Sequence, residues 1–215
     1  MAQPVSLEAF GLSKEFGYMQ HRDPVTSLSA ANGAWDEMAR NLPKYLMGSD
    51  FRSRVKSLPP FKMDALASEG EVRRAMLALS YIGMAYQWSE NDAAHVIPAV
   101  LAKPWYELGV KVGRPPILSY VSYSIDNWYR LDPKKEIECG NIALLQCFLG
   151  GQDEEWFILI HIDIEKKAGI ALDAIELAQK AVVANDSDAL DIALTQLRDG
   201  IKSMYEVLAR MPEKC

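Results

Sequence analysis

The stretch from Ser68 to Trp88 constrains the fold of this chain more than any other part of its sequence. Ser68 and Glu71 have the spacing of an N-terminal capping box, which predicts that a helix begins here. Apolar residues then recur at three- and four-residue steps along one side of this helix, and the opposite side is also largely apolar. A helix that is apolar all round must be covered on all sides, so we expect it at the centre of a helical core.

Further helices are expected around this one. Apolar positions at helical spacing predict helices over residues 29–47, 51–58 and 117–129. Near the end of the chain, Asp186 or Ser187 can cap another helix. Its apolar residues alternate steps of four and three and form a heptad seam, which requires a partner. The seam consists of Leu190, Leu194, Leu197, Ile201, Met204, Leu208 and Met211.

Other segments are expected to lack regular structure. Residues 1–25 mix Gly, Pro and charged residues without a helical period, which is typical of an extended arm. A loop is expected after Asp132 and Pro133. The pair at 150–151, both glycines, is the best internal boundary, and we interpret it as a hinge between a small domain (1–150) and the beginning of a larger one.

The composition argues against several classes of function. The chain has 23 Lys and Arg against 29 Asp and Glu, a net charge of −6, and no basic block that would track a phosphate backbone, so nucleic acid is not expected as a partner. Cys139, Cys147 and Cys215 are widely spaced and form no C-x-x-C pair, which argues against a disulfide framework and a zinc knuckle. The chain opens without a secretory pattern, and its longest nearly apolar stretch, 75–86, is shorter than the roughly 20 residues that span a bilayer. We expect a soluble cytoplasmic protein.

The segment WFILIHIDIE, Trp156 to Glu165, can be interpreted in two ways. Its alternation of β-branched residues is typical of a strand, which would place His161, Asp163 and Glu165 on one face as possible ligands of a metal ion. As a helix, the same segment places Phe157, His161 and Glu165 one turn apart on a common face. The residues alone favour a core histidine hydrogen-bonded to a carboxylate over either kind of site.

Other candidate sites are weaker. Tyr120, Tyr123, Trp128 and Tyr129 could line a pocket for a flat ligand, although aromatic residues at helical spacing more often belong to a core. Cys147 is expected to be a buried apolar side chain. The sequence contains no phosphate-binding glycine loop and no nucleophile elbow, so nucleotide binding and hydrolase chemistry have no support.

Six blocks in colinear order make the chain resemble the indoleamine 2,3-dioxygenase family from about Phe16 to Met211. The blocks are HRDPVTSL, WDEMARNLPKYL, RRAMLALSYIGMAYQW, VIPAVLAKPWYELGVKVGRPPILSYVSY, NWYRLDP and DEEWFILIHIDIE. Members of that family are haem proteins with a small and a large helical domain, and they cleave the C2–C3 bond of the indole ring of L-tryptophan to give N-formylkynurenine. The resemblance implies an all-α, multi-helical fold, in which residues 151–215 begin the large haem domain. It also implies that WFILIHIDIE is a helix at the distal face of the haem, so local β propensity is overruled there.

The resemblance further implies roles for individual residues in binding substrate. Tyr120, Tyr123 and Ser124 match positions that line the distal substrate pocket of the family, and Phe157 matches an aromatic residue that packs near the indole. His161 stands where animal and fungal members typically carry a serine. The related tryptophan 2,3-dioxygenases use a distal histidine to accept a hydrogen bond from the indole N–H, a role that only a neutral imidazole can fill.

The implied cofactor is haem b, with O₂ as co-substrate. Tyr120, Phe157 and Ile164 are the residues expected to contact it, and His161 is expected to be a catalytic contact to substrate or oxygen, not the iron ligand. The activation of O₂ belongs to the iron, while the protein supplies orientation and a dry pocket.

The chain departs from the family pattern in two ways. Tyr123 is larger than its counterpart in the animal enzymes, which favours another indole as an alternative substrate. The family's proximal histidine and the arginine that binds the substrate carboxylate lie beyond the position of Cys215, and none of His21, His95 and His161 aligns with the proximal ligand. We therefore expect no iron ligand here and a C-terminal half or second chain that completes the haem site. A non-enzymatic helical protein that binds haem or a partner is the other alternative, suggested by the heptad seam.

Overall fold

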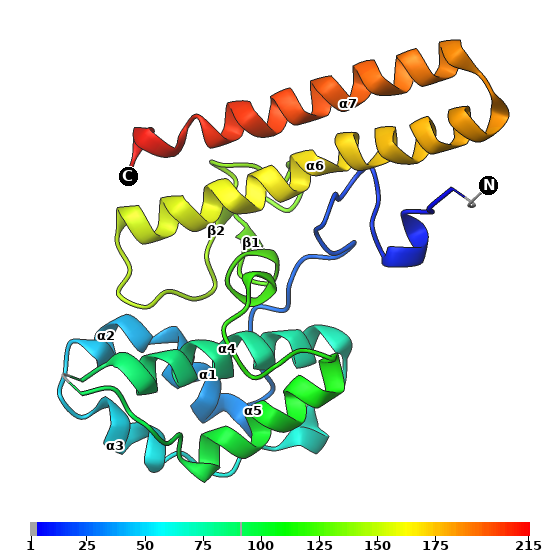
Figure 1. The fold of residues 1–215 in the computed structure, drawn as a ribbon. Coiled ribbons are helices and arrows are strands. Elements are labelled where there is room, and N and C mark those ends of the chain that lie inside the picture. Colours follow the sequence, from blue (N-terminus) through cyan, green and yellow to red (C-terminus); the bar gives the residue numbers. More distant parts are fainter. Residues whose placement is uncertain (1–3, 91) are drawn as a thin grey trace. The chain divides into compact units, whose positions relative to one another are not determined.

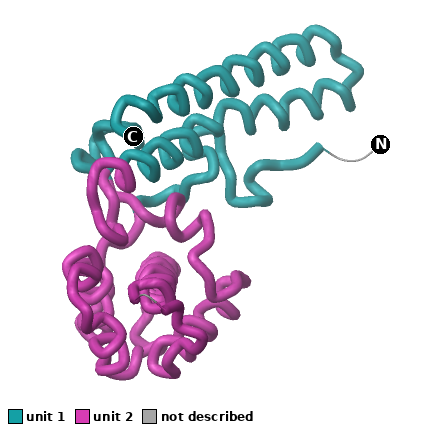
Figure 2. The backbone as a smooth tube through the Cα atoms, turned by 60° about the vertical axis from the view of Figure 1, so that its left-hand side comes forward, with its two compact units in different colours: residues 1–23, 130–142, 156–215 teal, residues 24–129, 143–155 magenta. Residues whose placement is uncertain are grey.

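The computed structural model describes residues 4–90 and 92–215, and it is mostly helical, as the all-α prediction requires (Figure 1). Residues 1–3 of the expected arm lie outside the described residues. Two short strands, β1 (Tyr129–Arg130) and β2 (Ile142–Ala143), pair with each other. None of the described helices is both long enough and apolar enough to cross a membrane. The chain divides into two compact units: unit 1 comprises residues 1–23, 130–142 and 156–215, and unit 2 comprises residues 24–129 and 143–155 (Figure 2).

The predicted central helix is the core of unit 2. It is α4 (Glu69–Trp88), and Ser68 caps it, since the Ser68 hydroxyl accepts a hydrogen bond from the Glu71 amide at 3.2 Å. Most side chains of α4 are buried on all sides, as its pattern predicted. The helices packed against it are α1 (Gly33–Arg40), α3 (Phe51–Lys56) and α5 (Ala99–Val112).

The close approach of α5 to α4 depends on Gly83. A Cβ atom at Gly83 would lie 2.3 Å from the ring of Trp105, so no larger residue fits without displacing that indole. The indole N–H of Trp105 donates to the hydroxyl of Ser80 at 3.1 Å. A small residue and a hydroxyl one turn apart on α4 therefore fix where α5 crosses it.

The helix predicted over residues 29–47 is interrupted, and that prediction is wrong in its continuity. α1 ends at Arg40, and a second helix, α2 (Leu42–Leu46), begins after Asn41. Pro43 has no N–H and so cannot continue the ladder to the carbonyl of Ala39. That carbonyl instead accepts a hydrogen bond from the Gln146 side chain.

The helix predicted over residues 117–129 is also wrong. Only residues 121–125 are helical, as a π-helix (Val121–Ile125), and β1 follows it. Side chains, and not the N–H groups of a continuing helix, donate to two of the last carbonyls. The side-chain amide of Asn127 donates to the carbonyl of Tyr123 at 3.1 Å, and the indole of Trp128 donates to the carbonyl of Ile125 at 2.9 Å. Side-chain donors that compete for carbonyls in this way end a helix.

Unit 1 is built on two long helices that lie side by side as an antiparallel hairpin (Figures 1 and 2). These are α6 (Gln152–Ala184), whose residues from Trp156 onward belong to unit 1, and α7 (Ser187–Leu208). The turn between them has Asn185 at φ 54°, and the Asp186 carboxylate caps α7 by accepting from the Ala189 amide at 2.9 Å. The helical interpretation of WFILIHIDIE and the predicted cap are confirmed.

The face of α7 that packs on α6 differs from the predicted heptad seam. Its buried residues are Ala193, Gly200 and Val207, which are also spaced by seven. A Cβ atom at Gly200 would lie 2.7 Å from the backbone nitrogen of Ala171, so the two helix backbones approach closely there. The two helices come closest where α7 has small residues, and the larger apolar residues of α7 lie on either side of this line of contact. Of the predicted seam, Leu194, Ile201 and Leu208 are exposed, and the other four positions are half-buried.

The N-terminal arm is irregular, as predicted, but it is bound along α6. Backbone atoms meet at two glycines: a Cβ atom at Gly17 would lie 2.1 Å from the carbonyl oxygen of Glu165, and one at Gly169 would lie 2.1 Å from that of Lys14. The Leu7 amide donates to a carboxylate oxygen of Glu176 on the same helix at 2.8 Å. Nothing in the pattern of apolar and polar residues indicated this contact.

Candidate functional site

The candidate residues of unit 1 lie on the first turns of α6. Phe157 and His161 are one turn apart, and their rings contact each other, with centroids 4.5 Å apart. Phe157 remains 46% exposed although the helix around it is largely buried, while His161 is half-buried. The structure therefore presents an aromatic ring and an imidazole together on one helix face.

The contact of His161 with its own helix determines which ring nitrogen can accept a hydrogen bond. Its Nδ1 lies 2.6 Å from the carbonyl oxygen of Phe157. A carbonyl oxygen only accepts, so Nδ1 must carry the hydrogen, and in the neutral ring the acceptor lone pair is then on Nε2. A neutral His161 with this tautomer can receive an N–H donor at Nε2.

Other side chains of this segment face elsewhere on the helix. Ile164 is half-buried and packs against Trp156, Ile160 and Val207, and the Trp156 indole donates to the carbonyl of Arg210 at 3.0 Å. This contact belongs to the pairing of α6 with α7.

The metal triad suggested by the strand interpretation is excluded. In the helix, Asp163 turns away from the face of His161; it is 2% exposed, and one of its carboxylate oxygens accepts from the Cys139 amide at 2.9 Å. Burial, aided by the nearby Asp163 carboxylate, raises the pKa of Cys139 to about 12. Within residues 4–90 and 92–215, no group of three or more His, Cys, Asp or Glu side chains could hold a metal ion.

The candidate residues of unit 2 surround the π-helix. Tyr120 immediately precedes it and contacts Tyr123 edge to face, with ring centroids 5.2 Å apart. Ser124 is fully buried, and its hydroxyl has no hydrogen-bond partner among the described residues. Single π-turns are frequent at functional sites. Unit 2 thus brings together two tyrosine rings and an unpaired buried hydroxyl.

A buried amide that the sequence analysis did not single out holds this π-helix. The side chain of Asn127 donates to the hydroxyl of Tyr81 at 3.1 Å, to the Tyr123 carbonyl at 3.1 Å and to the Gln146 carbonyl at 2.9 Å. Asn127 is fully buried, which is unusual for this residue type. The sequence feature that could have pointed to Asn127 is its position in the NWYRLDP block, which resembles the family.

Of two other candidates, Trp128 belongs to the core, whereas Cys147, which was expected to be buried, is only partly so. Trp128 is fully buried, so it lines no open pocket. Cys147 is half-buried, and burial raises the pKa of its thiol to about 12, as expected for a side chain in apolar surroundings. His21 and His95 are both exposed, and the ring of His21 stacks on that of Phe16 at 5.3 Å.

The geometry defines a mostly helical protein that presents an aromatic ring and an imidazole together on one helix face. Comparison with known proteins gives the family. The family model described as indoleamine 2,3-dioxygenase matches residues 6–215. The chain therefore belongs to the indoleamine 2,3-dioxygenase family.

Individual relatives cover nearly the whole chain. It is 34% identical to rat indoleamine 2,3-dioxygenase 1 over 208 residues, which are 95% of this chain and 51% of the relative. It is 29% identical to the indoleamine 2,3-dioxygenase of Saccharomyces cerevisiae, over 97% of this chain and 49% of the relative. A protein named myoglobin from Haliotis diversicolor is 26% identical, over 96% of this chain and 53% of the relative. The chain thus spans about half the length of the curated relatives it matches.

Proposed function

We propose that this chain supplies the distal side of a haem-dependent dioxygenase that cleaves the C2–C3 bond of the indole ring of L-tryptophan. The observation that carries the proposal is the pairing of Phe157 with His161 on α6, together with an imidazole tautomer whose acceptor is Nε2. The family to which the chain belongs supports the reaction class.

The residues present fit one face of a haem. An exposed Phe157 ring offers apolar contact beside the imidazole of His161, which is what a distal face requires. Haem, when bound, supplies the iron that activates O₂. Because none of His21, His95 and His161 aligns with the family's proximal ligand, the proposal assigns that ligand to a second polypeptide or to the half of the relatives that is not matched here.

Each candidate residue has a role in this proposal. His161 accepts the indole N–H at Nε2 and so orients the ring, while Phe157 packs against it. In unit 2, Tyr120, Tyr123 and Ser124 remain the candidates for substrate contacts that the family resemblance implies. Orientation of this kind is how a protein accelerates a reaction whose chemistry a cofactor performs.

The completing half would bind a continuous apolar surface of unit 1. On α7, Leu194, Ile201, Tyr205 and Leu208 are 47–67% exposed, and their steps of seven, four and three residues place them on one side of the helix. Exposed apolar surface in such a row is typical of an interface. We assign it to the helical half that the relatives have in addition to the region matched here. The location proposed for the assembled protein is the cytoplasm, which suits cysteines that form no disulfide among the described residues.

The activity is tested by reconstitution. The chain is mixed with haem, a reductant and the C-terminal half of the rat relative as a second polypeptide, and L-tryptophan is added. We expect a Soret band and the absorbance of N-formylkynurenine. The variant His161→Ala is expected to keep the Soret band and to lose turnover by about tenfold to a hundredfold, as for removal of one positioned hydrogen bond. His95→Ala, at an exposed position, is the control, and loss of haem in His161→Ala would contradict the assignment.

A specific observation supports each of two alternatives. Tyr123 would reshape the pocket for another indole, in which case a substituted indole would be turned over and tryptophan would not. The similarity to an abalone protein named myoglobin favours a haem protein without dioxygenase activity. Reversible O₂ binding by the reconstituted protein, with no product from either indole, would establish that alternative.

A further inference from the structure

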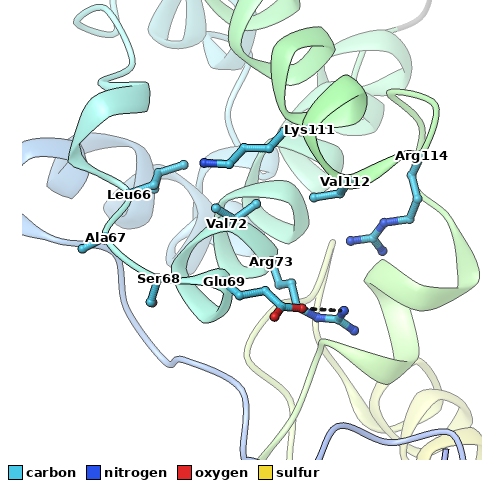
Figure 3. A pocket seen from close by; sticks show the side chains of 9 residues that line it. All are labelled: Leu66, Ala67, Ser68, Glu69, Val72, Arg73, Lys111, Val112 and Arg114. Carbon is cyan, nitrogen blue, oxygen red and sulfur yellow. Dashed lines mark ion pairs between the residues drawn. The ribbon is translucent and has the colours of Figure 1, made fainter. Parts of the chain in front are cut away.

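Unit 2 has a pocket that none of the candidate residues lines. It has a volume of about 490 Å³ and opens between the beginning of α4 and the end of α5 (Figure 3). Leu66, Val72 and Val112 form apolar parts of its wall, and Arg73, Lys111 and Arg114 bring three cationic groups to it. A pocket of this size holds a small molecule, and its chemistry is set by the three cations.

The cations exceed the carboxylates that face them. Asp126, whose side chain is 1% exposed, binds Arg73 at 2.9 Å and lies 3.6 Å from Arg114, so one carboxylate serves two guanidinium groups. Glu69 is 3.7 Å from Arg73 but its side chain is 85% exposed, and such surface pairs contribute little. Lys111 forms no ion pair with any described residue. The pocket therefore carries surplus positive charge.

The position of Arg114 is fixed by the end of α5. Gly113, at φ 66°, ends the helix in the left-handed conformation, and the Arg114 amide then donates to the Gly109 carbonyl at 2.9 Å. A Cβ atom at Gly109 would lie 2.6 Å from the carbonyl oxygen of Arg114, so this turn requires glycine there too. Burial lowers the pKa of Arg114, and neighbouring Arg73 lowers it further against the opposing effect of Asp126. An anion in the pocket would relieve this repulsion.

We propose that this pocket binds a small phosphomonoester, with its phosphate beside Arg114 and a short apolar body that extends along Val112 and Val72 toward Lys111. Guanidinium groups and a lysine ammonium are the usual ligands of a phosphate dianion. The ligand is distinct from the indole and the haem of the proposed function, and its binding does not depend on that function.

The binding is tested with the complete chain at physiological salt, by calorimetry and amide NMR shifts. Inorganic phosphate and butyl phosphate are the probes, and succinate is the comparison anion. We expect butyl phosphate to bind more tightly than phosphate, because its alkyl chain covers the apolar wall, and both to bind more tightly than succinate. The amide shifts should be confined to residues 66–73 and 111–114. Equal affinity for succinate and butyl phosphate, or shifts elsewhere, would overturn the proposal.

Two charge-reversal variants distinguish an effect of the pocket on ligand binding from an effect of the net charge of the chain. Lys111→Glu and Lys103→Glu change the net charge equally and both alter exposed positions of α5, but only Lys111 lines the pocket. We expect Lys111→Glu to weaken butyl phosphate binding by about tenfold or more and Lys103→Glu by less than about twofold. Unchanged thermal melting verifies that both variants fold. Equal effects of the two variants, or no binding to the unaltered chain, would refute the site.

Discussion

At the scale of single residues, buried polar groups decide the local structure more than the apolar pattern does. Asn127 donates to the Tyr123 carbonyl, the Tyr81 hydroxyl and the Gln146 carbonyl. These bonds end the π-helix that carries Tyr123 and Ser124. The residue types near a site could be found from the sequence, whereas their hydrogen-bond partners could not, since Tyr81 and Gln146 are distant in the chain.

The variant Asn127→Ala is expected to lose about 2–3 kcal/mol of the free energy of unfolding, because the buried acceptors that share the two N–H groups of this amide lose their donor. Urea denaturation measures this change. Asn41→Ala is the control, since the Asn41 amide makes only an exposed hydrogen bond within its own helix end, to the Glu37 carbonyl at 3.0 Å. An equal effect of the two changes would show that the Asn127 bonds add nothing beyond local structure.

The two partly buried thiols predict a fall in stability at alkaline pH. Burial raises the pKa of Cys139 and of Cys147 to about 12, whereas an unfolded thiol ionises near about pH 8.5. The stability that these groups contribute is therefore fully present below about pH 8.5 and is lost as pH rises toward 12, because only the unfolded chain releases the protons in that window.

Denaturation at pH 8 and pH 10 measures that loss. Cys147→Ser should reduce the fall between the two pH values, since a serine hydroxyl does not titrate there. Cys215→Ser, at an exposed position, should leave the fall as it is in the unaltered chain. A Cys147→Ser chain with an unaltered pH dependence would show that the buried Cys147 thiol does not cause the fall.

At the scale of elements, helix pairing in unit 1 follows small residues. The sequence predicted where α7 begins, and the heptad spacing predicted that it pairs. It did not predict which residues face α6, because the closest packing occurs where Gly200 meets Ala171, and this contact is visible only once both helices are placed.

A larger residue at Gly200 should therefore separate the two helices. We expect Gly200→Val to lower the free energy of unfolding by about 1–3 kcal/mol, because overpacking against the Ala171 backbone outweighs the small gain in helix propensity over glycine. Thr195→Val places the same side chain at an exposed position of α7 and should change stability by less than about 1 kcal/mol. Thermal melting followed by circular dichroism compares the variants, and similar melting temperatures would rule out close packing at Gly200.

At the scale of the whole molecule, the chain has apolar surface that its own described residues do not cover. Ile201 lies in the row on α7 that we assign to the completing half, and it is 55% exposed. Because it makes little contact in this chain, Ile201→Glu should leave the stability of the isolated chain within about 0.5 kcal/mol of its original value.

The same variant should fail to assemble. With the C-terminal half of the rat relative added, we expect the unaltered chain to form a complex in size-exclusion chromatography and to melt at a higher temperature, since a partner that binds only the folded state stabilises it. Ile201→Glu should do neither, while Lys202→Glu, at the adjacent exposed position, should do both. Assembly of Ile201→Glu to the same extent would place the interface elsewhere.

The sequence by itself determined the helical class, the central position of α4, the caps of α4 and α7, and the family. These follow from short-range spacing and from many colinear blocks. The resemblance also gave the helical state of WFILIHIDIE against its own β propensity. Tertiary structure decided the rest: that residues 126–128 end the helix predicted over 117–129, and that small residues of α7 face α6. Each of these depends on contacts between residues far apart in the chain, which outweigh local preference because burial and hydrogen bonding there involve larger free energies than propensity does.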